Sequence, residues 1–316
     1  MDTIAARVCG RLGGRDRQRV ERHLGDCAPC RDLAAALAGS VLSRLPAKVA
    51  GATALLSAGT GVGRYRVTRL LGAGGMGVVY AAHDPELGRD VAVKVLHPLL
   101  AEDPAAARAF LLAEARAMAR LRHPNVVAVY DAGAFGDQVY VAMELIAGQT
   151  LRDWLAVARP WRQVLDVMRA AGRGLAAAHA AGLVHRDFKP ENVLIGGSGE
   201  VCVSDFGIAL HAGTGDGELA GTPMYMAPEQ RAGAWIDARA DQYAFALVLC
   251  EALTGLRPDQ SFDVIRPPRD RAFPSWLRRA CARALSPSPE ARFPSMDALL
   301  DRLDRRAVQL RRGAVA

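Results

Sequence analysis

The 316-residue sequence contains almost no lysine. Lys48, Lys94 and Lys189 are the only three, although lysine and arginine together number 40. Arginine has therefore replaced lysine nearly everywhere. A planar guanidinium does not substitute for a compact ammonium in a tight phosphate site. We therefore expect Lys94 and Lys189, which lie in the larger part of the chain, to occupy positions where a point charge is required.

Long apolar runs and a secretory leader are also absent from the sequence. No stretch of about 20 apolar residues occurs, so no membrane-spanning helix is expected. The first residues lack the charged-then-apolar pattern of a signal peptide. These absences predict a cytoplasmic protein without a membrane span.

The charge balance and the cysteines exclude two further classes of protein. The formal net charge is +7 and the sequence pI is about 9.4, but the arginines are scattered, so no nucleic-acid partner is expected. Cys202, Cys250 and Cys281 lie in apolar surroundings and are predicted to be buried core residues. Nothing in the cysteine spacing indicates a secreted disulfide framework.

Residues 1–40 are predicted to form a separate small unit, followed by a linker at 41–63 that is rich in Ala, Gly, Ser and Thr. His23, Cys27 and Cys30 place one imidazole and two thiolates around one point, which are three ligands of a tetrahedral zinc site. Cys9 is the candidate for the fourth ligand. The alternatives are a disulfide within the Cys-x-x-Cys pair or two thiols without a role.

The His-x-x-x-Cys-x-x-Cys run resembles the zinc-binding anti-sigma-factor domain. That resemblance implies a bound Zn²⁺ and a protein partner for this segment. The family usually has its fourth ligand further upstream of the histidine than Cys9 lies.

A glycine-rich segment begins the larger part of the chain. An alternating strand pattern from Tyr65 to Leu70 leads into it, and a second strand follows from Gly77 to Ala82. In dinucleotide-binding folds such a loop opens a helix, so the strand that follows it here argues against them. The next strand, Asp90–Leu96, carries Lys94. The residues of the segment are Leu71, Gly72, Ala73, Gly74, Gly75, Met76, Gly77, Val78 and Val79.

A second motif carries acid–base and metal-binding groups at short spacing. In the run from His185 to Asn192, Asp187 can accept a proton from a hydroxyl, and Lys189 lies on the same face of an extended segment. Asn192 supplies an oxygen ligand suited to Mg²⁺. Asp205, in Asp-Phe-Gly, follows after a predicted strand hairpin and supplies a second such oxygen.

Together these motifs resemble those of the bacterial, eukaryotic-like Ser/Thr protein kinases over about residues 65–303. The resemblance implies an α+β, two-lobed fold at 64–303, with a β-rich small lobe at 64–146 and a helical large lobe at 147–303. A basic tail at 304–316 would follow.

The resemblance also assigns roles to individual residues. It implies that ATP binds under the glycine-rich segment, with Lys94 on its phosphates and Glu114 paired to Lys94. Met143 would be the gatekeeper, and Glu144 and Ile146 would meet the adenine edge. Further residues would support the site: Thr222 to Glu229 would contact substrate, Arg292 would pair with Glu229, and Asp241 would hold the catalytic loop.

The predicted function is transfer of the ATP γ-phosphoryl group to protein Ser or Thr hydroxyls, with autophosphorylation, in bacterial signal transduction. Asp187 would be the base, Lys189 would neutralise the transferred group, and Asn192 and Asp205 would hold Mg²⁺. The alternatives are a pseudokinase or scaffold, and an anti-sigma-type binding protein regulated by the kinase domain. Thr214 is the free hydroxyl available for regulatory phosphorylation between Gly207 and Gly221.

Overall fold

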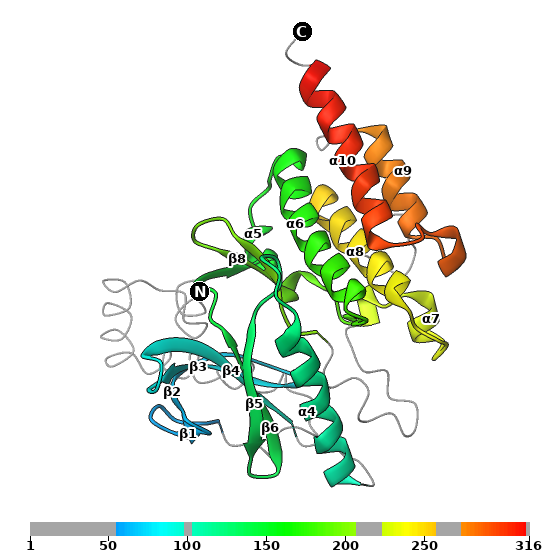
Figure 1. The fold of residues 1–316 in the computed structure, drawn as a ribbon. Helices are drawn as coiled ribbons and strands as arrows, with labels where there is room; N and C mark the ends of the chain where they lie inside the picture. Colours follow the sequence, from blue (N-terminus) through cyan, green and yellow to red (C-terminus); the bar gives the residue numbers. More distant parts are fainter. Residues whose placement is uncertain (1–54, 98–102, 207–222, 257–272, 314–316) are drawn as a thin grey trace, which may run out of the picture.

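The computed structural model describes residues 55–97, 103–206, 223–256 and 273–313. They form two lobes, a small one dominated by strands and a larger one dominated by helices (Figure 1). The two-lobed α+β architecture predicted from the sequence is therefore confirmed. Residues 1–54, which include the proposed zinc ligands, lie outside the described part, as does Thr214.

The small lobe is one twisted antiparallel sheet with a helix packed on it. The strand order is β1-β2-β3-β4-β6-β5, and α4 contacts β5 and β6 (Figure 1). The elements are β1 (Gly61–Val62), β2 (Tyr65–Gly74), β3 (Gly77–Asp84), β4 (Arg89–Leu96), α4 (Pro104–Arg120), β5 (Val129–Phe135) and β6 (Gln138–Glu144).

The first strand places the start of the folded lobe earlier than the sequence predicted. β1 pairs with β2 through Val62 and Tyr65, and both side chains are fully buried. Leu56 donates its backbone N–H to the Tyr80 hydroxyl at 3.1 Å. The lobe thus includes residues assigned to the linker at 41–63. A two-residue strand has no periodicity to reveal it, and only its packing against the sheet identifies it.

Helix α4 begins where its sequence favours a helix start. The Asp103 carboxylate accepts hydrogen bonds from the backbone N–H groups of Ala105 and Ala106, both at 3.0 Å, and Pro104 occupies the first helical position. An aspartate cap followed by proline satisfies the orphan donors and fixes φ. This start fixes the register that places Glu114 on the inner side of the lobe.

The large lobe is organised around α8, whose residues are all buried from Ala240 to Thr254. Helices α6, α9 and α10 pack around it, and a three-stranded sheet of order β7-β8-β9 lies toward the small lobe (Figure 1). The elements are β7 (Gly148–Thr150), α5 (Leu151–Trp154), α6 (Trp161–Ala180), η1 (Pro190–Asn192), β8 (Val193–Gly196), β9 (Val201–Val203), η2 (Pro223–Tyr225), α7 (Pro228–Arg231), α8 (Ala238–Thr254), α9 (Ser275–Ala284), η4 (Pro289–Ala291) and α10 (Met296–Gly313).

Hydrogen bonds tie the segment between α4 and β5 to the large lobe. The Asn125 side chain donates to the Val201 carbonyl at 2.8 Å, and Val127 N–H donates to the Val203 carbonyl at 2.9 Å. Val203 N–H in turn donates to the Asn125 carbonyl at 2.9 Å. The segment that follows α4 is thus fixed against β9, next to the Asp-Phe-Gly segment that carries Asp205.

Candidate active site

The loop between α6 and η1 is held from below by a buried carboxylate of α8. Asp241 accepts hydrogen bonds from the backbone N–H groups of His185 and Arg186, both at 2.7 Å, and from His179 Nε2 at 2.7 Å. Burial alone would raise the pKa of Asp241, but the hydrogen bond and charge of His179 outweigh it and lower the pKa below its usual range. The expectation that Asp241 holds this loop is confirmed.

The same contacts hold Arg186 in a conformation that non-glycine residues rarely adopt. Its φ is 66°, in the left-handed region, and Asp205 has a φ of 58°. Such a conformation costs on the order of 1–3 kcal/mol and persists only where the surroundings enforce it. Arg186 directly precedes Asp187, and Asp205 pairs with Lys94, so both strained positions belong to the candidate site.

Three predicted catalytic residues are brought together on this loop. Lys189 Nζ donates to Asp187 Oδ2 at 2.6 Å, and Asn192 Nδ2 donates to the Asp187 carbonyl at 2.8 Å. Asp187 and Asn192 are buried, each at 5% exposure. The Asn192 amide nitrogen is therefore turned toward the loop backbone, which leaves its carbonyl oxygen as the group that could bind a ligand.

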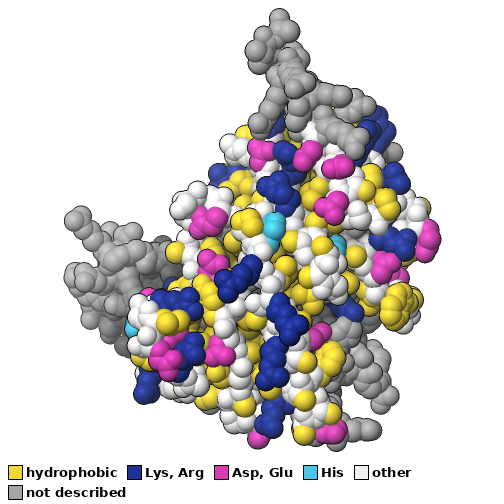
Figure 2. All heavy atoms as spheres, viewed as in Figure 1, with side chains coloured by type: hydrophobic (Ala, Val, Ile, Leu, Met, Phe, Trp, Pro, Cys, Tyr) yellow, Lys and Arg dark blue, Asp and Glu magenta, His cyan; other side chains and the backbone are white. Residues whose placement is uncertain are grey.

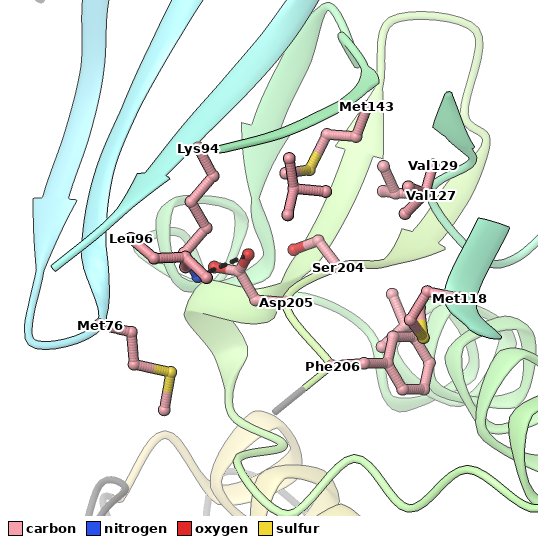
Figure 3. Close-up of a pocket in the computed structure, with 12 residues that line it drawn as sticks. Met76, Lys94, Leu96, Met118, Val127, Val129, Met143, Ser204, Asp205 and Phe206 are labelled. Atoms are coloured by element: carbon pink, nitrogen blue, oxygen red, sulfur yellow. Dashed lines mark ion pairs between the residues drawn. The ribbon is translucent and has the colours of Figure 1, made fainter. Parts of the chain in front are cut away.

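Lys94 crosses from the small lobe to the large lobe and pairs with Asp205. Its Nζ lies 2.9 Å from Asp205 Oδ1 (Figure 3). Burial alone would raise the pKa of Asp205, but the Lys94 ammonium, with smaller contributions from His185 and Lys189, lowers it. Asp205 is therefore ionised at neutral pH.

The predicted ion pair between Lys94 and Glu114 is not present in this arrangement, because Lys94 pairs with Asp205 instead. Glu114 lies within electrostatic reach of Arg186. Burial raises the pKa of Glu114 to about 7, and the guanidinium of Arg186 lowers it by less than burial raises it. The partner predicted for Lys94 is therefore wrong for this arrangement.

The predicted glycine-rich segment forms a tight hairpin over the cleft. Gly74 pairs with Gly77, Ala73 with Val78, and Gly72 with Val79 across β2 and β3. At Gly77 the backbone passes so close to the Val95 carbonyl that a Cβ atom would overlap it. Leu71, Gly75 and Met76 complete the segment, and Met76 points into the cleft (Figure 3).

The end of β6 forms the back edge of the cleft. Met143 is buried and points into the cavity between the lobes (Figure 3). Glu144 donates its backbone N–H to the Ala128 carbonyl at 2.9 Å and pairs with Val91 of β4, which fixes the end of β6. Ile146 follows and is half-buried.

A narrow cavity lies between the two lobes. It is lined by Lys94, Met118, Met143, Asp205 and Phe206, among others (Figure 3). Its volume is about 20 Å³, which is room for about one water molecule. Lys94 of the small lobe and Asp205 of the large lobe therefore share the wall of one cavity.

A buried ion pair fixes α7, the helix in which the predicted substrate-contacting segment ends. Arg292 Nη1 and Nη2 donate to the two oxygens of Glu229 at 2.6 and 2.7 Å, as predicted. Gln230 Nε2 donates to the Arg186 carbonyl at 2.8 Å. Helix α7 is thereby fixed to the catalytic loop.

Sequence reasoning missed several contacts that support the site. Arg152 donates to Glu191 at 2.8 Å and to the Tyr225 hydroxyl at 2.6 Å, and it pairs with Glu251. His179 and Gln230 were missed as well. These partners are 39 to 99 residues apart in the Arg152 cluster, and no short-range spacing connects them.

The proposed zinc ligands His23, Cys27, Cys30 and Cys9 lie outside the described residues, so the zinc site stays a prediction. Within the described residues, no three His, Cys, Asp or Glu side chains form a cluster that could hold a metal ion. Cys202, Cys250 and Cys281 are buried with free thiols, as predicted. Among the described helices, none combines the length and the apolar character that crossing a membrane requires.

Comparisons with known proteins agree with this geometry. The chain matches the family described as "Protein kinase domain" over residues 65–299. It is 37% identical over 267 residues to the serine/threonine-protein kinase Pkn1 of Myxococcus xanthus, which covers 78% of this chain and 38% of that protein. It is 44% identical over 207 residues to the serine/threonine-protein kinase PknA of Mycobacterium tuberculosis, which covers 62% of this chain and 48% of that protein.

A solved structure is similar as well. The crystal structure of the Mycobacterium tuberculosis PknI kinase domain aligns with a TM-score of 0.66 at 34% identity, over 80% of this chain and 99% of that one. The chain spans less than half the length of the two curated relatives named above.

Proposed function

Because the chain belongs to the protein kinase family, we propose that it transfers the γ-phosphoryl group of ATP to Ser or Thr hydroxyls of proteins, including its own, in bacterial signalling. The observation that carries this proposal is the convergence of Asp187, Lys189 and Asn192 on one strained loop held by Asp241. This loop carries the proposed base, the proposed phosphate-neutralising lysine and one of the two proposed metal ligands.

Asp187 orients the acceptor hydroxyl and takes its proton. A general base contributes about 10²–10⁴-fold in rate. Lys189 donates a hydrogen bond to the Asp187 carboxylate at 2.6 Å, so its ammonium lies beside the base and can neutralise the phosphoryl group in transfer. Because the transition state is loose, positioning and charge neutralisation supply most of the acceleration. The rigid backbone under this loop serves both.

The residues present fit a magnesium ion. Asp205 offers an ionised carboxylate, 28% exposed, and Asn192 retains its amide oxygen once its nitrogen has bonded to Asp187. Hard oxygen ligands of this kind suit Mg²⁺. Bound there, Mg²⁺ would neutralise charge on the phosphates of ATP. In this arrangement the Lys94 ammonium, 2.9 Å from Asp205 Oδ1, is paired with the carboxylate that would bind the metal.

We further propose that Lys94 exchanges Asp205 for Glu114 when the site is loaded. Glu114 is the acid of α4 that lies toward the catalytic loop, where Arg186 affects its pKa. The exchange would free the Asp205 carboxylate for the metal and leave Lys94 beside the ATP phosphates. A ligand drives such an exchange only by binding one arrangement more tightly than the other.

Two substitutions test the proposed function on the full chain. Asp187→Asn and Lys94→Met should each abolish transfer of labelled γ-phosphate to the chain itself, because one removes the base and the other the phosphate-binding ammonium. Asp90→Asn, an exposed aspartate on the same strand as Lys94, is the matched control and should retain activity. Wild-type rates in the Asp187→Asn enzyme would refute the assignment.

For the N-terminal segment we propose a zinc site formed by His23, Cys27 and Cys30, with Cys9 as the fourth ligand, and a protein partner for residues 1–40. The support is the ligand chemistry of the sequence. One zinc per chain, lost in the Cys27→Ala/Cys30→Ala variant, is the expected metal content. Wild-type protein purified with zinc that contains none would remove this proposal without affecting the kinase assignment.

A further inference from the structure

Trp235 is the most exposed large hydrophobic side chain in the described part of the chain, at 90%. The next ones, Val157 and Leu87, are 62% and 60% exposed. Figure 2 shows hydrophobic side chains at the edge of the molecule where Figure 1 places the turn after α7. Tryptophan gains more than most side chains from burial and is enriched among residues that dominate binding energy.

The backbone that carries Trp235 is fixed on both sides. In the turn after α7, Ala234 N–H donates to the Glu229 carbonyl at 2.9 Å and Gly233 N–H donates to the Gln230 carbonyl at 3.2 Å. Ile236 packs against the core of the large lobe, and Asp237 caps α8. On a fixed backbone, a tryptophan has few side-chain torsions to order on binding, so it loses little conformational entropy.

This turn has a fixed position relative to the catalytic base. Glu229 is anchored by Arg292, and Gln230 is bonded to the carbonyl of Arg186, the residue before Asp187. The turn also continues directly from the segment at 222–229 that is expected to contact substrate. A protein held at Trp235 would therefore be held at a constant offset from the site of phosphoryl transfer.

Resting on the proposed function, we propose that Trp235 is a docking anchor for protein substrates, outside the segment that carries the accepting Ser or Thr. The flat apolar ring fits an aliphatic or proline side chain of the substrate. Short peptides that end near the accepting hydroxyl would not reach it.

The test compares one protein substrate with one short peptide. The protein substrate is the full chain carrying Asp187→Asn, which cannot transfer phosphate itself. The peptide spans a phosphorylated site mapped in that chain. The enzymes are wild type, Trp235→Ala, Trp235→Phe and, as a matched exposed hydrophobic residue of the small lobe, Leu87→Ala.

Trp235→Ala should raise the KM for the protein substrate about tenfold, which equals about 1.4 kcal/mol, with kcat and both peptide constants unchanged. Trp235→Phe should recover most of the loss, and Leu87→Ala should show none. Unchanged KM for the protein substrate would overturn the anchor, as would an equal loss with the peptide. A changed sedimentation profile without a change in KM would assign Trp235 to another partner and overturn it too. No transfer by wild type to either substrate would overturn the proposed function itself.

Discussion

Arg292 supports the sharpest stability prediction that the structure allows. Its side chain is 1% exposed and makes two short hydrogen bonds to Glu229, at 2.6 and 2.7 Å. It also donates to the carbonyls of Ser286 and Arg239 at 2.9 Å and of Pro287 at 3.2 Å. One guanidinium therefore joins α7, the start of α8 and the segment before η4.

Truncating Arg292 leaves the Glu229 carboxylate buried and three carbonyls without this donor. Breaking a buried ion pair by removing one partner costs about 3–5 kcal/mol. Against a total stability of about 5–15 kcal/mol for a domain, Arg292→Ala should lower the free energy of unfolding by about 4 kcal/mol. Arg292→Lys should fall between, because it keeps the charge but loses the bidentate fork.

Urea unfolding followed by tryptophan fluorescence measures these differences. In a double-mutant cycle, Glu229→Ala combined with Arg292→Ala should cost much less than the sum of the two single changes, because the second removal also removes the stranded charge. Arg279→Ala, an exposed arginine of α9, is the control and should stay within about 0.5 kcal/mol of wild type. A loss below about 1 kcal/mol in Arg292→Ala, or strict additivity of the pair, would refute the reasoning.

Two further predictions concern charges at the site. Glu114 has a pKa of about 7 against an ordinary 4.5, so its contribution to stability is fully present below pH 4.5 and is lost as the pH rises through 7. The full shift corresponds to about 3.4 kcal/mol, which partial exposure reduces to roughly half. Urea unfolding from pH 4.5 to 8 should show this decline in the free energy of unfolding of wild type and not of Glu114→Gln. The same dependence on pH in both proteins would contradict the prediction. Asp241→Asn should lower kcat by about 10²-fold, because the loop would lose one of its two carboxylate oxygen acceptors and shift. Asp166→Asn, at an exposed aspartate of α6, is the control and should leave kcat unchanged. A kcat in Asp241→Asn equal to that of wild type would contradict the loop-holding role.

The elements that sequence reasoning predicted well are those whose signal is local. The predicted strand Gly77–Ala82 lies within β3 at Gly77–Asp84, and the predicted strand Asp90–Leu96 is β4 at Arg89–Leu96. A short run rich in β-branched and other apolar residues is enough to predict a buried strand. The order of the glycine hairpin, the strand with Lys94 and the catalytic loop can likewise be predicted from the sequence, because each motif is a short run of residues.

Features that depend on packing were harder to predict. β1 has two residues and lies in a stretch of linker-like composition, yet Val62 is fully buried. The pairing of Arg292 with Glu229 spans 63 residues and was found only through the resemblance to a family. The Arg152 cluster had no such guide. Polar groups that meet across the core carry no signal in their spacing, because the fold alone brings them together.

The partner of Lys94 could not be read from the sequence for a physical reason. One ammonium is within reach of the large lobe's Asp205 and is expected to serve the small lobe's Glu114 as well, so the choice depends on the relative position of the two lobes. In the present arrangement Asp205 takes the lysine and is ionised, whereas burial raises the pKa of Glu114 to about 7. The arrangement therefore holds Asp205 ionised beside Lys94, and Glu114 with a raised pKa.

The different states of Asp205 and Glu114 favour one change in the cleft, in which Lys94 leaves Asp205 and pairs with Glu114. Raising the pH ionises Glu114 and makes its burial away from Lys94 less favourable, while any cation that takes over Asp205 releases the lysine. Both changes favour the same exchange, and neither requires a change in the catalytic loop, which Asp241 holds independently through two backbone hydrogen bonds. The site thus combines a loop that is fixed with a lysine whose partner is not, and control of the enzyme through this cleft would act on the lysine.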